Sequence, residues 1–149
     1  MDEVLPAIRL LEDRTELRVV DLETLPLDEA VDFIVIPGGS CDLAVVHAGL
    51  HALLQKTLDA GGLIAGICNG AVVMASAGIL RGRRCTHTAH PMHAPRPQFN
   101  ELLDFAETAF AGSHYTNEDL TIDGNLITAK PQFTEDFARA IAQHLGIKH

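Results

Sequence analysis

The sequence lacks the features expected of a membrane, secreted or nucleic-acid-binding protein. Its longest apolar stretches are strand-length, far short of the roughly 20 residues that a membrane-spanning helix needs. Met1 is followed by Asp2 and Glu3, so the basic segment that opens a signal peptide is missing. With 11 basic and 20 acidic residues, the net charge is −9, which repels phosphate backbones and anionic lipids. We therefore expect a cytoplasmic protein that binds neither nucleic acid nor membranes.

Cysteine is also scarce, and its pattern excludes a disulfide framework. Three cysteines are present, an odd number without a C-x-x-C pair: Cys41, Cys68 and Cys85. This pattern predicts free thiols in a reducing compartment. Basic residues gather at one place, a loop in which we expect solvated side chains: Arg81, Arg83 and Arg84.

Strand-length apolar runs alternate with helical patterns along the whole chain. The expected strands cover residues 17–20, 33–36 and 63–67 and a hairpin at 120–128, and the expected helices residues 5–11, 40–60, 71–77 and 134–146. Runs without polar alternation are typical of strands buried on both faces of a parallel sheet. The order of elements predicts one α/β domain over residues 1–149, with a mainly parallel sheet between two layers of helices.

Cys68 occupies the most informative position in the sequence. The strand at 63–67 leads through it directly into a helix, and Gly66 and Gly70 lie two residues away on either side. This is the spacing of the G-x-S-x-G nucleophile elbow, in which a strained turn needs small neighbours. A helix N-terminus stabilises a thiolate, the nucleophilic form of cysteine. Most free cysteines are merely small buried hydrophobes, but strand, glycines and helix together indicate a reactive one.

A family resemblance rests on several segments in combination: residues 32–39 (DFIVIPGG), 64–70 (IAGICNG), 77–84 (AGILRGRR), 123–129 (DGNLITA) and 137–141 (FARAI). The chain resembles the ThiJ/PfpI family, part of the class I glutamine amidotransferase-like superfamily, over residues 32–146. The resemblance implies a three-layer, flavodoxin-like sandwich, commonly a homodimer, without a cofactor. Activities in the family include amide hydrolysis, glyoxalase and deglycase reactions, isonitrile hydration, redox sensing and chaperone roles.

The resemblance also suggests partners for the cysteine. An acidic residue of the family hydrogen-bonds the thiol, and alignment places Glu3 there, or Asp2 if the helix proline is matched instead. Some members carry a histidine directly after the cysteine, but here Asn69 takes that place. His114 matches a histidine near the cysteine in one member, and His87 matches another loop histidine. Either is a candidate acid/base, because imidazole titrates near neutral pH.

Three histidines near Cys85 recur at intervals of three residues: His87, His90 and His93. Their spacing could suggest a metal site, but Pro91 and Pro95 prevent the helix that would align them. We therefore expect a loop at the mouth of the cleft and no metal.

Two hypotheses follow from these residues. In the first, Cys68 attacks an electrophilic carbon of a small carbonyl compound, amide or related molecule, while backbone amides near Gly38, Gly39 and Asn69 hold the oxyanion. In the second, the protein is a redox sensor or chaperone-like stress protein in which Cys68 is oxidised reversibly.

The chain departs from the family at its N-terminal end. The family has a strand of about six residues ahead of the acidic position, whereas this chain starts at Met1, close to where that strand ends. We therefore expect an N-terminally short domain that lacks the family's first strand, with residues 17–20 paired directly to residues 33–36, or a gap filled by a partner chain.

Overall fold

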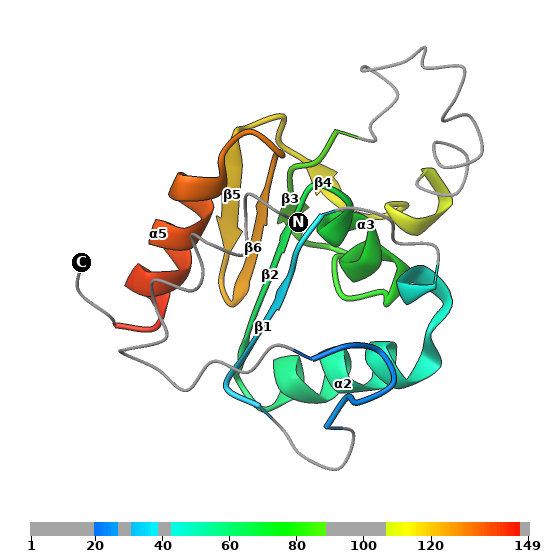
Figure 1. Ribbon diagram of the computed structural model, residues 1–149. Coiled ribbons are helices and arrows are strands. Elements are labelled where there is room, and N and C mark those ends of the chain that lie inside the picture. Colours follow the sequence, from blue (N-terminus) through cyan, green and yellow to red (C-terminus); the bar gives the residue numbers. More distant parts are fainter. Residues whose placement is uncertain (1–19, 27–30, 39–42, 89–106, 147–149) are drawn as a thin grey trace.

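Four strands form the central sheet in the computed structural model (Figure 1), which describes residues 20–26, 31–38, 43–88 and 107–146. Their order across the sheet is β1 (Phe33–Ile36), β2 (Leu63–Ile67), β6 (Leu126–Ala129) and β5 (Leu120–Asp123). The first three run parallel, and β5 pairs antiparallel with β6 as the expected hairpin. The mainly parallel α/β sheet is therefore confirmed.

Helices cover both faces of this sheet (Figure 1). Helix α5 (Thr134–His144) packs Phe137 and Ile141 on one face, against alternate residues of β2 and β6. Helices α2 (Ala48–Asp59) and α3 (Asn69–Ser76) cover the other face with their own apolar side chains. Strand β2 is buried throughout, because both of its faces meet helices. The expected three-layer sandwich is confirmed.

The helix expected over residues 40–60 is interrupted. A 3-10 turn η1 (Ala44–Val46) precedes α2, and His47 between them has an extended backbone. Its Nδ1 accepts a hydrogen bond from the amide of Leu50 at 3.0 Å, which caps α2.

A second, two-stranded parallel sheet joins β3 (Arg84–Cys85) to β4 (His114–Tyr115). Two arginines anchor it to the hairpin, so they are not the free loop charges that the sequence predicts, although Arg84 is exposed as expected. The guanidinium of Arg83 donates to the backbone carbonyl of Asp123 at 2.7 Å, and Nε of Arg83 lies 3.4 Å from the carboxylate of the same aspartate. Arg84 donates from its guanidinium to the carbonyl of Ile122 at 2.9 Å. These contacts fix the amino end of β3 beside the turn of the hairpin.

Some expected elements cannot be compared with the structure. The helix at 5–11 lies outside the described residues, as does nearly all of the strand at 17–20. The pairing of that strand with β1 therefore stays a prediction. Within the described ranges, no helix combines the length and the apolar character needed to cross a membrane.

Candidate functional site

Cys68 forms a sharp turn between β2 and α3. Its backbone dihedrals, φ 56° and ψ −123°, lie near those of the first central residue of a type II′ turn, which is usually glycine. The Cys68 amide donates to the carbonyl of Ala129 at 3.0 Å, and its carbonyl accepts the amide of Ala71 at 3.1 Å. The thiol is half-buried at the N-terminus of α3. The geometry is that of a nucleophile elbow.

The two predicted glycines are required by close packing around the elbow. A Cβ atom on Gly66 would lie 2.6 Å from the Met74 sulfur and 2.7 Å from the carbonyl carbon of Gly70. A Cβ atom on Gly70 would overlap the carbonyl oxygen of Ile36 in β1. Strands β1 and β2 and helix α3 therefore approach one another too closely for any side chain at these positions.

Gly38 brings a second backbone segment up to the thiol. A Cβ atom there would lie 2.9 Å from the Cβ and 3.5 Å from the Sγ of Cys68. The absence of a side chain thus leaves the sulfur open on the side of β1. Asn69, the first residue of α3, adjoins the same space. Gly39, the other predicted contributor to an oxyanion pocket, lies outside the described residues.

His87 lies close to the carboxyl end of β6, as does Cys68. The preceding residue, Thr86, donates its amide to Oγ1 of Thr128 at 2.9 Å, and Thr128 adjoins Ala129, which bonds to the Cys68 amide. The His87 side chain is only 2% exposed. Its ring stacks on that of Phe110, with centroids 3.7 Å apart and an interplanar angle of 10°. Packing therefore fixes the orientation of this imidazole.

His114 lies at the other end of β3 and β6. It pairs in register with Arg84 and is exposed. The amide of Arg84 donates to the carboxylate of Asp123, and Asp123 pairs with Leu126, the first residue of β6. The amide of Cys68, by contrast, donates to Ala129, the last residue of β6. The structure therefore does not bring His114 to the cysteine. Within the described part of the chain, neither His114 nor His87 hydrogen-bonds to the thiol.

The remaining predicted residues differ in what the structure says of them. Cys85 is completely buried, and burial raises the pKa of its thiol, opposed by a hydrogen bond with Ser113. It is therefore a structural cysteine. The other candidates considered from the sequence lie outside the described residues: Asp2, Glu3, Cys41, His90 and His93.

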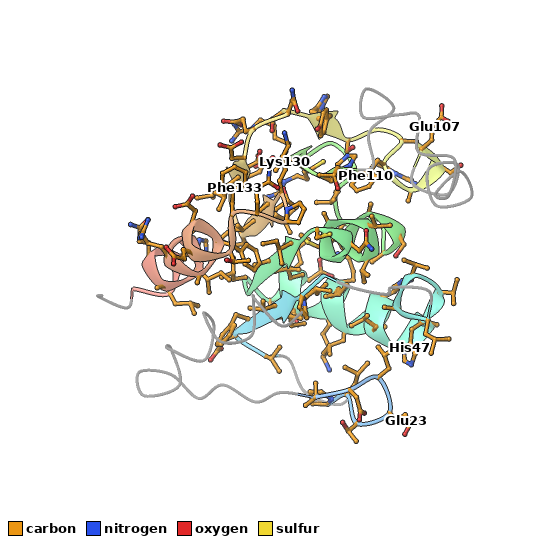
Figure 2. The ribbon with its side chains drawn as sticks, turned by 45° about the horizontal axis from the view of Figure 1, so that its top comes forward. Glu23, His47, Glu107, Phe110, Lys130 and Phe133 are labelled. Atoms are coloured by element: carbon orange, nitrogen blue, oxygen red, sulfur yellow. The ribbon has the colours of Figure 1, made fainter. Side chains whose placement is uncertain are left out.

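Lys130 lies just beyond the carboxyl end of β6 and is a polar residue that was not among those predicted from the sequence. It follows Ala129 directly, and its Nζ donates to the carbonyl and to Oδ1 of Asn117, at 3.1 and 2.8 Å. Figure 2 shows Lys130 and Phe110 in the part of the molecule that carries β4 to β6, away from His47. One signal was available, because polar residues that follow the carboxyl ends of parallel strands commonly line ligand sites.

Comparison with known proteins decides the family. A family model described as the DJ-1/PfpI family matches residues 19–144. The chain belongs to the DJ-1/PfpI family. The predicted ThiJ/PfpI resemblance is thereby confirmed.

Other DJ-1/PfpI proteins resemble the chain over part of their length. It is 26% identical over 113 residues to the deglycase TK1284 of Thermococcus kodakarensis, covering 74% of this chain and 60% of that protein. It is 32% identical over 120 residues to the protein dj-1beta of Drosophila melanogaster, covering 78% and 57%. The chain thus spans less than two thirds of these relatives.

A solved structure extends the likeness of fold. The ThiJ/PfpI domain protein from Brachyspira murdochii superposes with a TM-score of 0.69 at 20% identity. The match covers 97% of this chain and 88% of that one, so the described fold corresponds to most of a ThiJ/PfpI domain.

Proposed function

We propose that this DJ-1/PfpI protein is a cysteine-dependent enzyme that acts on a small carbonyl compound, amide or related electrophile. The observation that carries the proposal is the strained backbone of Cys68 at the N-terminus of α3. Such strain persists where the surrounding structure enforces it, and it clusters at active sites. The similarity to a protein named as a deglycase gives further support.

In the proposed reaction the Cys68 thiolate attacks the electrophilic carbon. The new sulfur–carbon bond forms as the π electrons of the carbonyl move to its oxygen. Backbone amides near Gly38, Gly39 and Asn69 stabilise the negative oxygen until it takes a proton. His87 is our candidate for the proton donor, in preference to His114, because it shares the carboxyl end of the sheet with Cys68. Glu3 remains the predicted acid beside the thiol.

The test is turnover of a panel containing methylglyoxal and simple amides. We expect activity in the wild type, its loss in Cys68→Ser, and its retention in the buried-cysteine control Cys85→Ala. His87→Gln should reduce kcat more than His114→Gln. Equal activity in wild type and Cys68→Ser would refute the enzymatic role.

A second candidate function is redox sensing, with Cys68 oxidised to the sulfenic or sulfinic acid. The contrast between the half-exposed Cys68 and the buried Cys85 favours selective oxidation of the former. Mass spectrometry after peroxide treatment tests it. Oxidation confined to Cys68, in a protein that turns over none of the panel, would favour sensing over catalysis.

A further inference from the structure

The feature that goes beyond the cysteine chemistry is the histidine that caps α2. His47 lies between η1 and α2 (Figure 2) and has an extended backbone, with φ −83° and ψ 103°. Its Nδ1 accepts the amide of Leu50 at 3.0 Å, and its carbonyl accepts the amide of His51 at 3.1 Å. The side chain thus binds an amide that the first turn of a helix leaves without an intrahelical partner.

The hydrogen bond from Leu50 requires a neutral imidazole at His47. Because Nδ1 accepts the amide, it carries no proton, and the proton of the neutral ring is on Nε2. When Nδ1 takes up a proton, both ring nitrogens become donors, and Nδ1 can no longer bind the amide. The new positive charge also lies at the N-terminus of α2, where the helix dipole disfavours it. Histidine is the side chain that ordinarily changes charge between about pH 5 and pH 8.

A second histidine, one turn further along α2, makes a contact of the opposite kind. Nε2 of His51 lies 3.2 Å from Oγ of Ser76, the last residue of α3. The Ser76 hydroxyl donates its single proton to the carbonyl of Val73 at 2.6 Å, so Oγ accepts from Nε2–H of the histidine. This nitrogen keeps its proton when the ring is charged. Acid therefore removes the cap at His47 and leaves the contact between His51 and Ser76 intact.

No carboxylate among the described residues is placed to hold a charged His47. Helix α2 has no acidic residue in its first turn, and its Lys56 and Asp59 lie at the other end. The elements that adjoin α2 or pack on it, η1, α3, β1 and β2, contain no titratable side chain. In the segment 20–26, which packs on the same apolar cluster, Asp21 binds the amides of its own turn and Glu23 is exposed. Neither of them forms an ion pair with His47.

The turn η1 depends on this cap because little else holds it. None of its three residues is fully buried. Ala44 and Val45 are partly buried against the apolar cluster shared by α2 and α3, whereas Val46 is 69% exposed. Segments with so few buried contacts open easily. The helix on which η1 packs is α3, which begins directly after Cys68.

We propose that His47 is an acid-sensitive cap that couples pH to the order of η1 and of the first turn of α2. With a neutral ring, α2 is capped and η1 lies on α3. As the pH falls through the range in which histidine titrates, the cap is lost, the first turn of α2 frays and η1 separates from α3. The stabilisation is present at neutral pH and lost in acid, because only the unprotonated ring provides it. The proposal does not depend on an enzymatic role for Cys68.

Amide hydrogen exchange, followed by NMR at about pH 7.5 and about pH 5, tests the proposal. Dividing the intrinsic exchange rate by the observed rate gives a protection factor, which removes the direct effect of pH on exchange. We expect the protection of the Leu50 amide in wild type to fall about tenfold in acid, the effect of losing a cap and charging a helix N-terminus. The internal control is the Phe137 amide, which bonds to the carbonyl of Phe133 in the first turn of α5, where no side chain caps the helix. Its protection should not change.

Three variants separate His47 from a general effect of acid. Asparagine is a strong cap that does not titrate, so His47→Asn should protect the Leu50 amide equally at both pH values. His47→Ala should protect it weakly at both. His51→Gln, the matched control in the same helix, should keep the wild-type response. Equal protection of Leu50 at both pH values in wild type would overturn the proposal, as would a pH response that persists in His47→Asn or disappears in His51→Gln.

Discussion

The backbone of Cys68 predicts an inverted effect of glycine on stability. At an ordinary helical or extended position, glycine is less stable than alanine by about 0.5–1 kcal/mol, because it gains more freedom on unfolding. Cys68 has φ 56° and ψ −123°, which glycine adopts readily and residues with a Cβ atom do not. We therefore expect Cys68→Gly to be more stable than Cys68→Ala.

The magnitude follows from two opposing effects. A residue held in such a sparsely populated region costs about 1–3 kcal/mol, which glycine relieves and alanine retains. Subtracting the usual penalty of glycine, with the middle of each range, leaves Cys68→Gly more stable than Cys68→Ala by roughly 1 kcal/mol. Both variants lose the sulfur, so its packing cancels in the comparison. In a protein of this size, the difference corresponds to about 2–4 °C in melting temperature.

Urea unfolding followed by circular dichroism measures the two free energies. The matched control is Gln55, an exposed residue within α2, where glycine and alanine variants both lose the 2.8 Å hydrogen bond to Asp59. At this position the glycine variant should be less stable than the alanine variant by about 1 kcal/mol. If Cys68→Gly were also less stable than Cys68→Ala, the elbow would not be strained, and the argument for an enforced reactive turn would fail.

Three further outcomes are expected. Iodoacetamide near pH 6, with peptide mapping, should modify Cys68 well before Cys85, since burial raises the pKa of the Cys85 thiol; equal labelling would contradict this. The amide of Arg84, with the Arg83 and Arg84 charges also contributing, lowers the pKa of the Asp123 carboxyl below 3.8. The ionised Asp123 carboxylate therefore contributes its full stabilisation above pH 3.8, and this contribution is lost as the pH falls through the lowered pKa. Asp123→Asn should therefore have a lower free energy of unfolding than wild type at pH 7, and the difference between the two proteins should shrink in acid. Urea unfolding at several pH values measures this difference. Light scattering at micromolar concentration should find a homodimer, and a monomer would exclude it.

The elbow and the central strands could be predicted because their causes are local. Apolar runs without polar alternation locate β1 and β2, and Gly66 and Gly70 reveal the turn at Cys68, since no larger residue fits beside Met74 and Ile36. The interruption at His47 could not be predicted, because leucines keep helical spacing through that region and the cap depends on a side-chain contact.

Features that depend on distant segments were harder to predict. The sequence predicts solvated loop charges at Arg83 and Arg84, because the hairpin to which they hydrogen-bond lies about forty residues further along the chain. The choice between His87 and His114 depends on strand register, which neither residue reveals in its own neighbourhood. Asn117, which accepts hydrogen bonds from the Lys130 ammonium, has φ 58°, a backbone conformation that sequence does not specify.

The pairing of β2 with β6 has a consequence for the order of folding. Ile64 meets Leu126 and Ile67 meets Ala129, contacts between residues about sixty positions apart, and such distant pairings form slowly. The amide of Cys68 finds its acceptor, Ala129, only when β6 has docked. The reactive turn is therefore completed only after β6, about sixty residues further along the chain, has been synthesised, and a nascent chain that stops before β6 cannot carry a fully formed elbow.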